Sequence, residues 1–215
     1  MKSIAIEEAV ARIPDCASLM IGGFMGCGTP EPLMDELLRQ GKRDLTIIAN
    51  DSAMPVVGIG KLIRARLVRK LIASHIGLNP ETQQQMLAGE LEVQLVPQGT
   101  LVERIRAGGA GLGGVLTPTG VGTVVEEGKQ KLCIDGCEYL LETSLRADFA
   151  LVQALICDYL GNLAYAMTAR NFNPIMATAA DTVIVYPDHI VPVGVIAPDN
   201  VVTPAPLVDY VIAKD

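Results

Sequence analysis

Residues 19–38 read LMIGGFMGCGTPEPLMDELL, and this stretch decides the fold. Its apolar start, Leu19 to Ile21, is typical of a parallel strand that is buried on both faces. A glycine-rich loop follows, and we expect Thr29 to cap the next helix and Pro30 to occupy its first turn. The helix then presents one apolar stripe, made by Leu33, Met34, Leu37 and Leu38. A strand, a glycine loop and a helix N-terminus in this order can bind a phosphate through free N–H groups.

The glycines of this loop are Gly22, Gly23, Gly26 and Gly28. They allow backbone angles that other residues avoid, and they let a ligand approach the main chain closely. A tight turn without a ligand explains them equally well, and the glycines alone leave both interpretations open. The spacing is not the dinucleotide fingerprint, because Glu31 stands at the third glycine position, and no Gly-Lys-Ser/Thr follows as in a P-loop. This weakens the case for a nucleotide-dependent oxidoreductase.

The chain has 215 residues, of which 50% are hydrophobic, 4% are aromatic and none is tryptophan. An aliphatic composition of this kind favours an α/β protein with a buried parallel sheet, and we expect residues 1–215 to form a single domain. The net charge of −7 argues against nucleic acid as a partner, because no basic stripe is present to neutralise phosphates. No apolar run is long enough to span a bilayer, so we expect no membrane partner.

The N-terminal sequence MKSIAIEEAVARI lacks the apolar core and the cleavage site of a signal peptide. The five cysteines are odd in number and lie in apolar or strand-like contexts, which predicts reduced thiols and a cytoplasmic protein. Cys133 and Cys137 are close in sequence, but two ligands without a second Cys or His pair do not make a zinc site. We therefore expect no metal centre.

Strands and helices alternate through roughly the first half of the sequence. Strands are expected at residues 19–21, 45–49, 69–76 and 91–96. Besides the helix after Thr29, helices are expected at residues 3–12 with Ser3 as the cap, at 56–66, after Asn79-Pro80, and after a capping box of Thr100 and Glu103. This alternation predicts parallel strands with right-handed crossovers, and hence a three-layer α/β/α sandwich with a mostly parallel sheet.

The second half has a different pattern. Residues 108–128 are rich in glycine and are expected to form a long loop or lid. Two short apolar runs, 131–134 and 137–141, flank Asp135-Gly136, which predicts a β-hairpin. Further strands are expected at residues 149–156, 164–167 and 182–186. The proline-rich tail that follows is expected to be extended and to wrap an edge of the sheet.

Polar residues stand directly after the expected strands, where ligands collect in parallel sheets. They are the glycine loop, the segment Asn50-Asp51-Ser52 and Gln98. Asn50 is equally well explained as a turn residue, and Gln98 as a loop hydrogen bond. His75 ends an apolar strand and is predicted to be a core histidine. The pair Glu126-Glu127 is predicted to be an exposed turn.

Several motifs occur in order along nearly the whole chain. They are Gly22-Gly23-Phe24-x-x-x-Gly28-x-Pro30, the stretch PQGTLVERIRAGGAG at residues 97–111, Thr117-Pro118-Thr119-Gly120, and Ala169-Arg170-Asn171-Phe172-Asn173. In these motifs the chain resembles the α subunits of the family I coenzyme A transferases, and it is most similar to the acetate and acetoacetate type.

The resemblance implies an enzyme that moves CoA between acetyl-CoA or acetoacetyl-CoA and short-chain fatty acids, through a glutamyl-CoA thioester. In this family the nucleophilic glutamate lies in a Ser-Glu-Asn-Gly motif on a homologous β subunit, and this chain lacks the motif. The resemblance therefore implies a half-enzyme, active only with its β partner in an α2β2 assembly. CoA is a substrate in this reaction, and no permanently bound cofactor is implied.

The resemblance favours a functional role for Asn50 and Gln98, whose neutral amide groups would stabilise the oxyanion of such a reaction. It also assigns the segment that contacts CoA. The CoA-contacting segment would comprise Phe24, Met25, Gly26, Cys27, Gly28, Thr29 and Pro30. Arg170 and Asn171 are equally well explained as residues that reach an acid or the partner and as residues that structure a loop. The alternative function is a non-catalytic α/β module that binds a sugar phosphate or a nucleotide.

Overall fold

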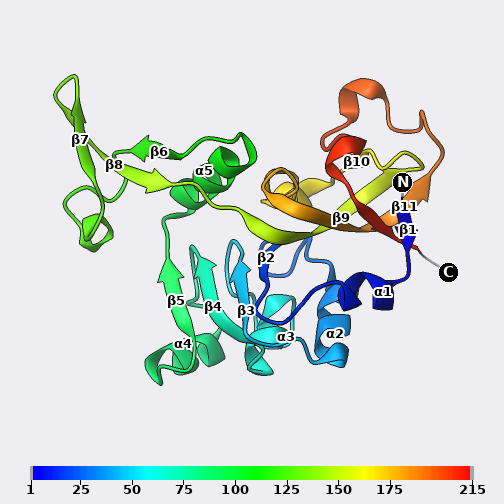
Figure 1. The fold of residues 1–215 in the computed structure, drawn as a ribbon, viewed down its shortest axis with the longest axis horizontal. Coiled ribbons are helices and arrows are strands. Elements are labelled where there is room, and N and C mark those ends of the chain that lie inside the picture. Colours follow the sequence, from blue (N-terminus) through cyan, green and yellow to red (C-terminus); the bar gives the residue numbers. More distant parts are fainter. Residues whose placement is uncertain (1, 214–215) are drawn as a thin grey trace.

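The computed structural model describes residues 2–213, and its centre is a nine-stranded sheet (Figure 1). The strands lie in the order β1 (Lys2–Ile4), β12 (Tyr210–Ile212), β11 (Ala180–Val191), β9 (Ala147–Asp158), β2 (Ser18–Ile21), β3 (Leu45–Ile48), β4 (Val68–Ala73) and β5 (Glu92–Leu95). All neighbours in this order are parallel, and β10 (Leu163–Ala164) pairs with β9 in the antiparallel sense. The prediction of a mostly parallel sheet is confirmed.

Helices cover both faces of this sheet. One face carries α1 (Ile6–Ala11), α2 (Glu31–Gln40), α3 (Ile59–Arg64) and α4 (Pro80–Leu87), and the other carries α5 (Gln98–Gly109) and α6 (Asn173–Met176). Each face has its own cluster of buried aliphatic side chains, because successive residues of a strand point to opposite sides. The three-layer α/β/α sandwich is therefore confirmed.

A second, antiparallel sheet contains β6 (Gly114–Thr117), β8 (Cys137–Thr143) and β7 (Lys131–Ile134), in that order. We call residues 114–143 the arm, and Figure 1 shows that it stands off the main sheet. The hairpin prediction is confirmed, since Asp135 and Gly136 have φ of 50° and 77°, as a two-residue hairpin turn requires. The expectation of one long loop over residues 108–128 is wrong, because it contains β6 and a short 3-10 helix at Val124–Glu126.

Three predicted helix caps are wrong. Ser3 lies in β1, and α1 begins after Ala5. Pro30 and Pro97 occupy the N-cap positions of α2 and α5, where extended backbone angles suit proline. The Thr29 hydroxyl instead donates to the Gly22 carbonyl at 3.0 Å and so holds the glycine loop closed. Thr100 lies inside the first turn of α5, and its buried hydroxyl has no hydrogen-bond partner in the described chain.

The C-terminal third also differs from the expectation. β11 runs on to Val191, and residues 164–167 form only the end of β10 before a 3-10 helix at Met167–Arg170. After two more 3-10 turns, Pro198–Asn200 and Ala205–Leu207, the tail does not wrap an edge. Its last segment, β12, inserts into the sheet between β11 and β1, where Val211 and Ile212 are buried.

All five cysteines are free, and Cys157 alone among them is buried. Burial raises the pKa of the Cys157 thiol to about 11. Within residues 2–213, no helix is both long and apolar enough to cross a bilayer.

Asp158 closes the turn between β9 and β10. Its Oδ1 accepts hydrogen bonds from the N–H groups of Leu160, Gly161 and Asn162 at 2.9 to 3.0 Å, and its Oδ2 accepts one from Asn162 Nδ2 at 2.9 Å. Burial acts to raise the pKa of Asp158, but these hydrogen bonds outweigh burial and hold the pKa below its usual value.

Replacing Asp158 by Asn is expected to make the fold less sensitive to acid. The pKa of this carboxyl is lower in the folded chain, so ionised Asp158 stabilises the fold above the unfolded pKa of about 4. That contribution is lost as the pH falls through the folded pKa. The stability difference between wild type and Asp158→Asn, measured by urea unfolding, should be largest near neutral pH and should shrink below about pH 4. A difference that stays constant down to about pH 2 would contradict this prediction.

Candidate functional site

A hollow of about 310 Å³ opens at the carboxyl edge of the parallel sheet. It is bounded by the loops after β2, β3 and β4 and by the start of α5, and it is lined by Phe24, Met25, Asn50, Asp51, Ser74, His75, Leu78 and Gln98. The carboxyl ends of parallel strands meet at one edge, which explains why these distant segments converge. Four predicted site residues, Phe24, Met25, Asn50 and Gln98, are therefore brought together. Residues 26–30 do not line this hollow.

A chain of hydrogen bonds connects three side chains in the hollow. Gln98 Nε2 donates to Asn50 Oδ1 at 2.5 Å, and Asn50 Nδ2 donates to Asp51 Oδ2 at 2.8 Å. Asp51 also accepts from the backbone N–H groups of Met25 at 3.0 Å and Ala53 at 2.7 Å. Asn50 is only 1% exposed and Asp51 only 7%, so bulk water competes little for these hydrogen bonds.

Asp51 sets the direction of both amides. An ionised carboxylate only accepts hydrogen bonds, so Asn50 turns its NH2 group towards Asp51 and its carbonyl towards Gln98. Gln98 must in turn offer its NH2 group to Asn50. Each NH2 group carries two hydrogens, and within residues 2–213 only one of them is hydrogen-bonded, so Asn50 and Gln98 each keep a second N–H. The arrangement can therefore present two neutral donors to an oxygen atom bound in the hollow.

The loop after β2 ends in a tight turn at the mouth of the hollow. Phe24 and Cys27 exchange two backbone hydrogen bonds of 2.9 Å, and between them Met25 and Gly26 have φ of 51° and 88°. A positive φ is uncommon for a residue such as Met25. Its N–H group is held by Asp51, so the same carboxylate that orients Asn50 also fixes this turn.

Most N–H groups of the loop are already hydrogen-bonded inside the protein. Among residues 22–29, only the N–H groups of Gly26 and Gly28 have no partner in the described chain. Glu31, the first residue of α2, directs its carboxylate to α3, where it accepts from the Gly58 N–H at 2.6 Å and pairs with Lys61 at 2.7 Å. The loop therefore offers a ligand two free N–H groups.

The glycines are required by the packing of the protein itself. A Cβ on Gly22 would lie 1.9 Å from Asn173 Oδ1, and a Cβ on Gly28 would lie 2.6 Å from Ala169 Cα. A Cβ on Gly26 would meet Val57 at 2.2 Å. The turn interpretation thus accounts for these glycines without a ligand.

The remaining candidate residues lie around the loop. Cys27 is exposed, Thr29 is buried behind the loop, and Pro30 starts α2. Arg170 Nε donates to the Tyr165 carbonyl at 3.5 Å, and the Asn171 carbonyl accepts from the Gly23 N–H at 3.4 Å. Both contacts structure the loop that packs on the glycines.

The prediction of a core role for His75 is wrong, because His75 is exposed and lines the hollow. Its backbone pairs with Asp51 in an isolated parallel bridge, and its carbonyl accepts from the Ser52 N–H at 3.1 Å. Ser74 and Leu78 were not predicted either. The signal was present, since His75 follows an apolar strand in the same way as Asn50 does.

Within residues 2–213, no group of three or more His, Cys, Asp or Glu side chains is placed to hold a metal ion. Glu126 belongs to the short 3-10 helix of the arm, where it accepts from the Gly122 N–H at 2.7 Å and pairs with Lys131 at 2.7 Å. These two partners hold the pKa of Glu126 below its usual value. Glu126 is thus a structural ion-pair residue of the arm, and it does not line the hollow.

Comparison with known proteins gives a consistent result. The family described as coenzyme A transferase matches residues 4–214. The chain is 57% identical to the acetate CoA-transferase subunit alpha of Escherichia coli K12, over 99% of this chain and 97% of that one. It is 51% identical to the acetoacetyl-CoA:acetate/butyrate CoA transferase alpha subunit of Clostridium acetobutylicum, over 99% of this chain and 98% of that one.

Solved structures share the fold. An acyl-CoA transferase of E. coli O157:H7, determined as a thioester complex with CoA, superposes with a TM-score of 0.86 at 24% identity. The match covers 99% of this chain and 47% of that chain. The family match and the two alpha-subunit relatives cover nearly every residue of the sequence, and this chain belongs to the coenzyme A transferase family.

Proposed function

We propose that this chain is the α subunit of an enzyme that transfers CoA between short-chain acyl-CoA and free carboxylates. The chain of hydrogen bonds from Gln98 through Asn50 to Asp51 is the observation that supports this most directly. It holds two neutral amide donors at the edge of the sheet, in a hollow large enough for an acyl group. The named relatives act on acetate, acetoacetyl-CoA and butyrate, so we propose acids of this size as substrates.

In the proposed reaction a glutamate carboxylate attacks the thioester carbonyl, and the CoA thiolate leaves. The resulting acyl-glutamyl anhydride is then attacked by the thiolate at the glutamyl carbonyl, which releases the free acid and leaves a glutamyl-CoA thioester. The incoming acid reverses these steps. Each attack places negative charge on a carbonyl oxygen, where the free N–H groups of Asn50 and Gln98 can stabilise it. Neutral donors suit this task because a cation would also stabilise the attacking carboxylate and slow its attack.

No glutamate is among the described residues that line the hollow. Asp51 is the one acidic residue that lines the hollow, and three hydrogen-bond donors already bind its two oxygens. Glu126 is paired with Lys131 on the arm. We therefore propose that a homologous β subunit supplies the nucleophile, in an α2β2 assembly, and that this chain contributes one domain to it.

The segment from Phe24 to Pro30 is proposed to contact CoA. Phe24 and Met25 line the hollow. The N–H groups of Gly26 and Gly28 have no partner among the described residues and could bind an amide carbonyl or a phosphate oxygen of CoA. No permanently bound cofactor takes part in this proposal. The free cysteines suit a reducing compartment, so the proposal places the enzyme in the cytoplasm.

The test is CoA transfer from acetoacetyl-CoA to acetate, measured with this chain alone and after mixing with its β subunit. Activity in the mixture alone is the expected result. Activity of this chain alone would place the nucleophile here and would direct mutation to Glu126 and Glu127. No activity in an assembled mixture, across several short-chain acids, would overturn the proposal in favour of a non-catalytic binding module for a sugar phosphate or a nucleotide.

A further inference from the structure

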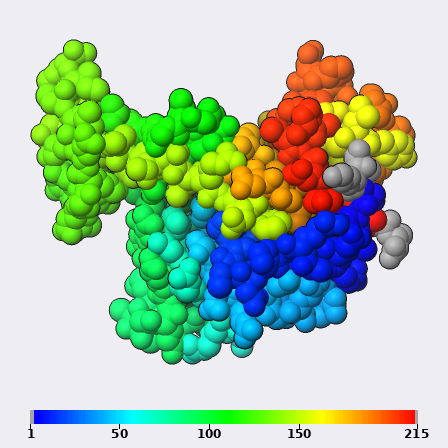
Figure 2. Space-filling view, viewed as in Figure 1, coloured from blue at the N-terminus to red at the C-terminus, as the bar shows by residue number. Residues whose placement is uncertain are grey.

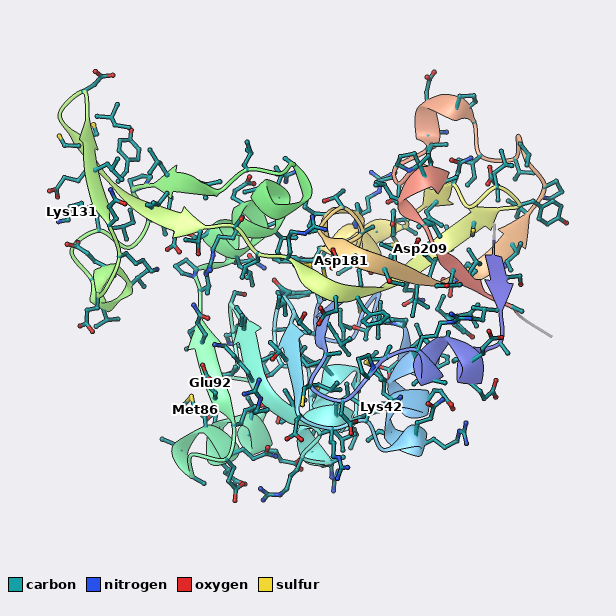
Figure 3. The ribbon with its side chains drawn as sticks, viewed as in Figure 1. Lys42, Met86, Glu92, Lys131, Asp181 and Asp209 are labelled. Carbon is teal, nitrogen blue, oxygen red and sulfur yellow. The ribbon has the colours of Figure 1, made fainter. Side chains whose placement is uncertain are left out.

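The arm has regular strands but almost no interior. From residue 111 to residue 139 no residue is buried, and within the arm only Leu140 and Glu142 are. Figure 2 shows the arm projecting from the body of the molecule, and Figure 3 shows its Lys131 well away from Glu92 of β5. A small antiparallel sheet needs an apolar face packed against something to be stable.

The pairing register shows which side chains share a face of the arm. Directly opposed residues of antiparallel strands lie on the same face, and neighbours along a strand alternate. Leu116 opposes Leu141, Leu132 opposes Tyr139, and Ile134 opposes Cys137. One face, which we call the apolar face, therefore consists of Leu116, Leu132, Ile134, Cys137, Tyr139 and Leu141. The other face carries the charged side chains, among them Lys131, Glu138 and Glu142.

The charged face is covered by the chain itself. A Cβ on Gly120 would lie 2.6 Å from Val125 and 3.4 Å from Leu140, so the loop after β6 lies over this face. Lys129 bonds to the Glu142 carboxylate, and Leu140 is fully buried. The apolar face is more open, since Leu116 is 40% and Ile134 44% exposed, Cys137 is exposed too, and the other three members are only half-buried. The more open face is thus the apolar one, which is the reverse of the usual arrangement.

The apolar face is continuous with the catalytic hollow. Leu116 lines a second hollow of about 480 Å³ together with Gly99 and Thr100 of α5, and its β6 neighbours Val115 and Thr117 line it too, so this hollow lies along the β6 edge of the arm. Gln98, the residue before Gly99, lines the catalytic hollow. A surface therefore runs from the catalytic hollow over the first turn of α5 to the apolar face, and a subunit that reaches the first hollow lies next to the arm.

We propose that the apolar face of the arm is the docking surface for the β subunit that delivers the nucleophilic glutamate. This inference rests on the proposed function. Contiguous apolar surface is rarely left open on a protein that works alone, and burying it on the partner would stabilise both the arm and the complex. Continuity with the catalytic hollow selects the β subunit as the occupant, because that subunit must enter the hollow.

Two neighbouring residues of β7 give a matched test. Ile134 lies on the apolar face, whereas Cys133 lies on the charged face opposite Glu138, and both are exposed. Ile134→Lys is expected to weaken the affinity for the separately purified β subunit at least about tenfold. Cys133→Lys, with the same added charge beside Glu138, should change it less than about twofold. Kd is measured by titration, and thermal unfolding of each variant alone verifies folding.

The outcomes separate this inference from the proposed function. If the wild-type pair transfers CoA and Ile134→Lys binds the β subunit as tightly as wild type, the docking inference alone fails. If the wild-type pair shows no CoA transfer, the proposed function fails. The Kd values of Ile134→Lys and Cys133→Lys for the β subunit still test whether the apolar face is the docking surface. At saturating β subunit, kcat of Ile134→Lys should return to the wild-type value, because the hollow is unchanged.

Hydrogen exchange on the wild-type chain provides a measurement that needs no variant. The backbone amides of residues 131–141 should exchange more slowly once the β subunit is added. Slower exchange that depends on the concentration of this chain alone, and does not respond to the β subunit, would identify a second copy of this chain as the occupant and overturn the inference.

Discussion

Asn50→Ala is expected to lower kcat of the assembled enzyme by about 100- to 1000-fold, with a much smaller change in KM for acyl-CoA. The Asn50 side chain is 1% exposed and held between Gln98 and Asp51, so its free N–H is fixed before substrate binds. Its stabilising effect is greatest when the carbonyl oxygen becomes charged, and for this reason kcat rather than KM should respond. Steady-state CoA transfer from acetoacetyl-CoA to acetate, with the β subunit present, measures both constants.

The hydrogen-bond chain also predicts how a second substitution behaves. Gln98 is oriented through Asn50 Oδ1, so Asn50→Ala removes one donor and releases the other. The Asn50→Ala, Gln98→Ala double variant should therefore lose little more activity than Asn50→Ala. If the fold-reductions in kcat of the two single variants multiply in the double variant, the two amides act independently. That result would contradict the role of the Gln98–Asn50 hydrogen bond in organising the site.

A matched control is available on α2. Gln40 also uses its amide in a hydrogen bond, to the Glu7 carbonyl at 2.8 Å, but it lies at the C-terminal end of the helix. Gln40→Ala should leave kcat unchanged. If Asn50→Ala retained more than about a third of the wild-type kcat, the oxyanion role of this residue would be wrong.

The fold could be predicted where a local signal and burial agreed. Asn79 caps α4 as expected, accepting from the N–H groups of Glu81 and Thr82, and Gly41 ends α2 with φ of 66°. The threonine caps failed because prolines took the N-cap positions: Pro30 directly follows Thr29, and Pro97 lies three residues before Thr100. Strands β6 and β12 were not predicted because β6 lies among the glycines of residues 108–128 and β12 follows the prolines of the tail.

The candidate site could be predicted as a set of positions but not as a network. Asn50 and Gln98 were found because both follow apolar strands, and the parallel sheet brings such residues to one edge. Nothing in the sequence indicates that two amides 48 residues apart bond to each other, or that Asp51 orients them. His75 also follows an apolar strand, but apolar neighbours are typical of a core histidine as well. The sequence therefore does not distinguish a buried His75 from one that lines the site.

The structure also assigns a role to Asn173 that the sequence did not indicate. Its side chain is fully buried, and its Oδ1 accepts from the Gln153 N–H at 3.1 Å. Its Nδ2 donates to the carbonyls of Gly28 at 2.7 Å and Ala169 at 2.9 Å. One side chain therefore joins β9, the glycine loop and the loop before α6. Asn171, two residues earlier, has a buried Oδ1 with no hydrogen-bond partner in the described chain.

Asn173→Ala is expected to lower the free energy of unfolding by about 3 kcal/mol, because two carbonyls and one N–H group would lose their partner in the interior. Asn171→Ala should change it by less than about 0.5 kcal/mol, since its buried oxygen makes no hydrogen bond that could be lost. Urea unfolding of this chain measures both values. Equal losses of unfolding free energy for the two variants would contradict the prediction. They would show that the packing of the asparagine side chains, rather than the hydrogen bonds of Asn173, holds the glycine loop in place.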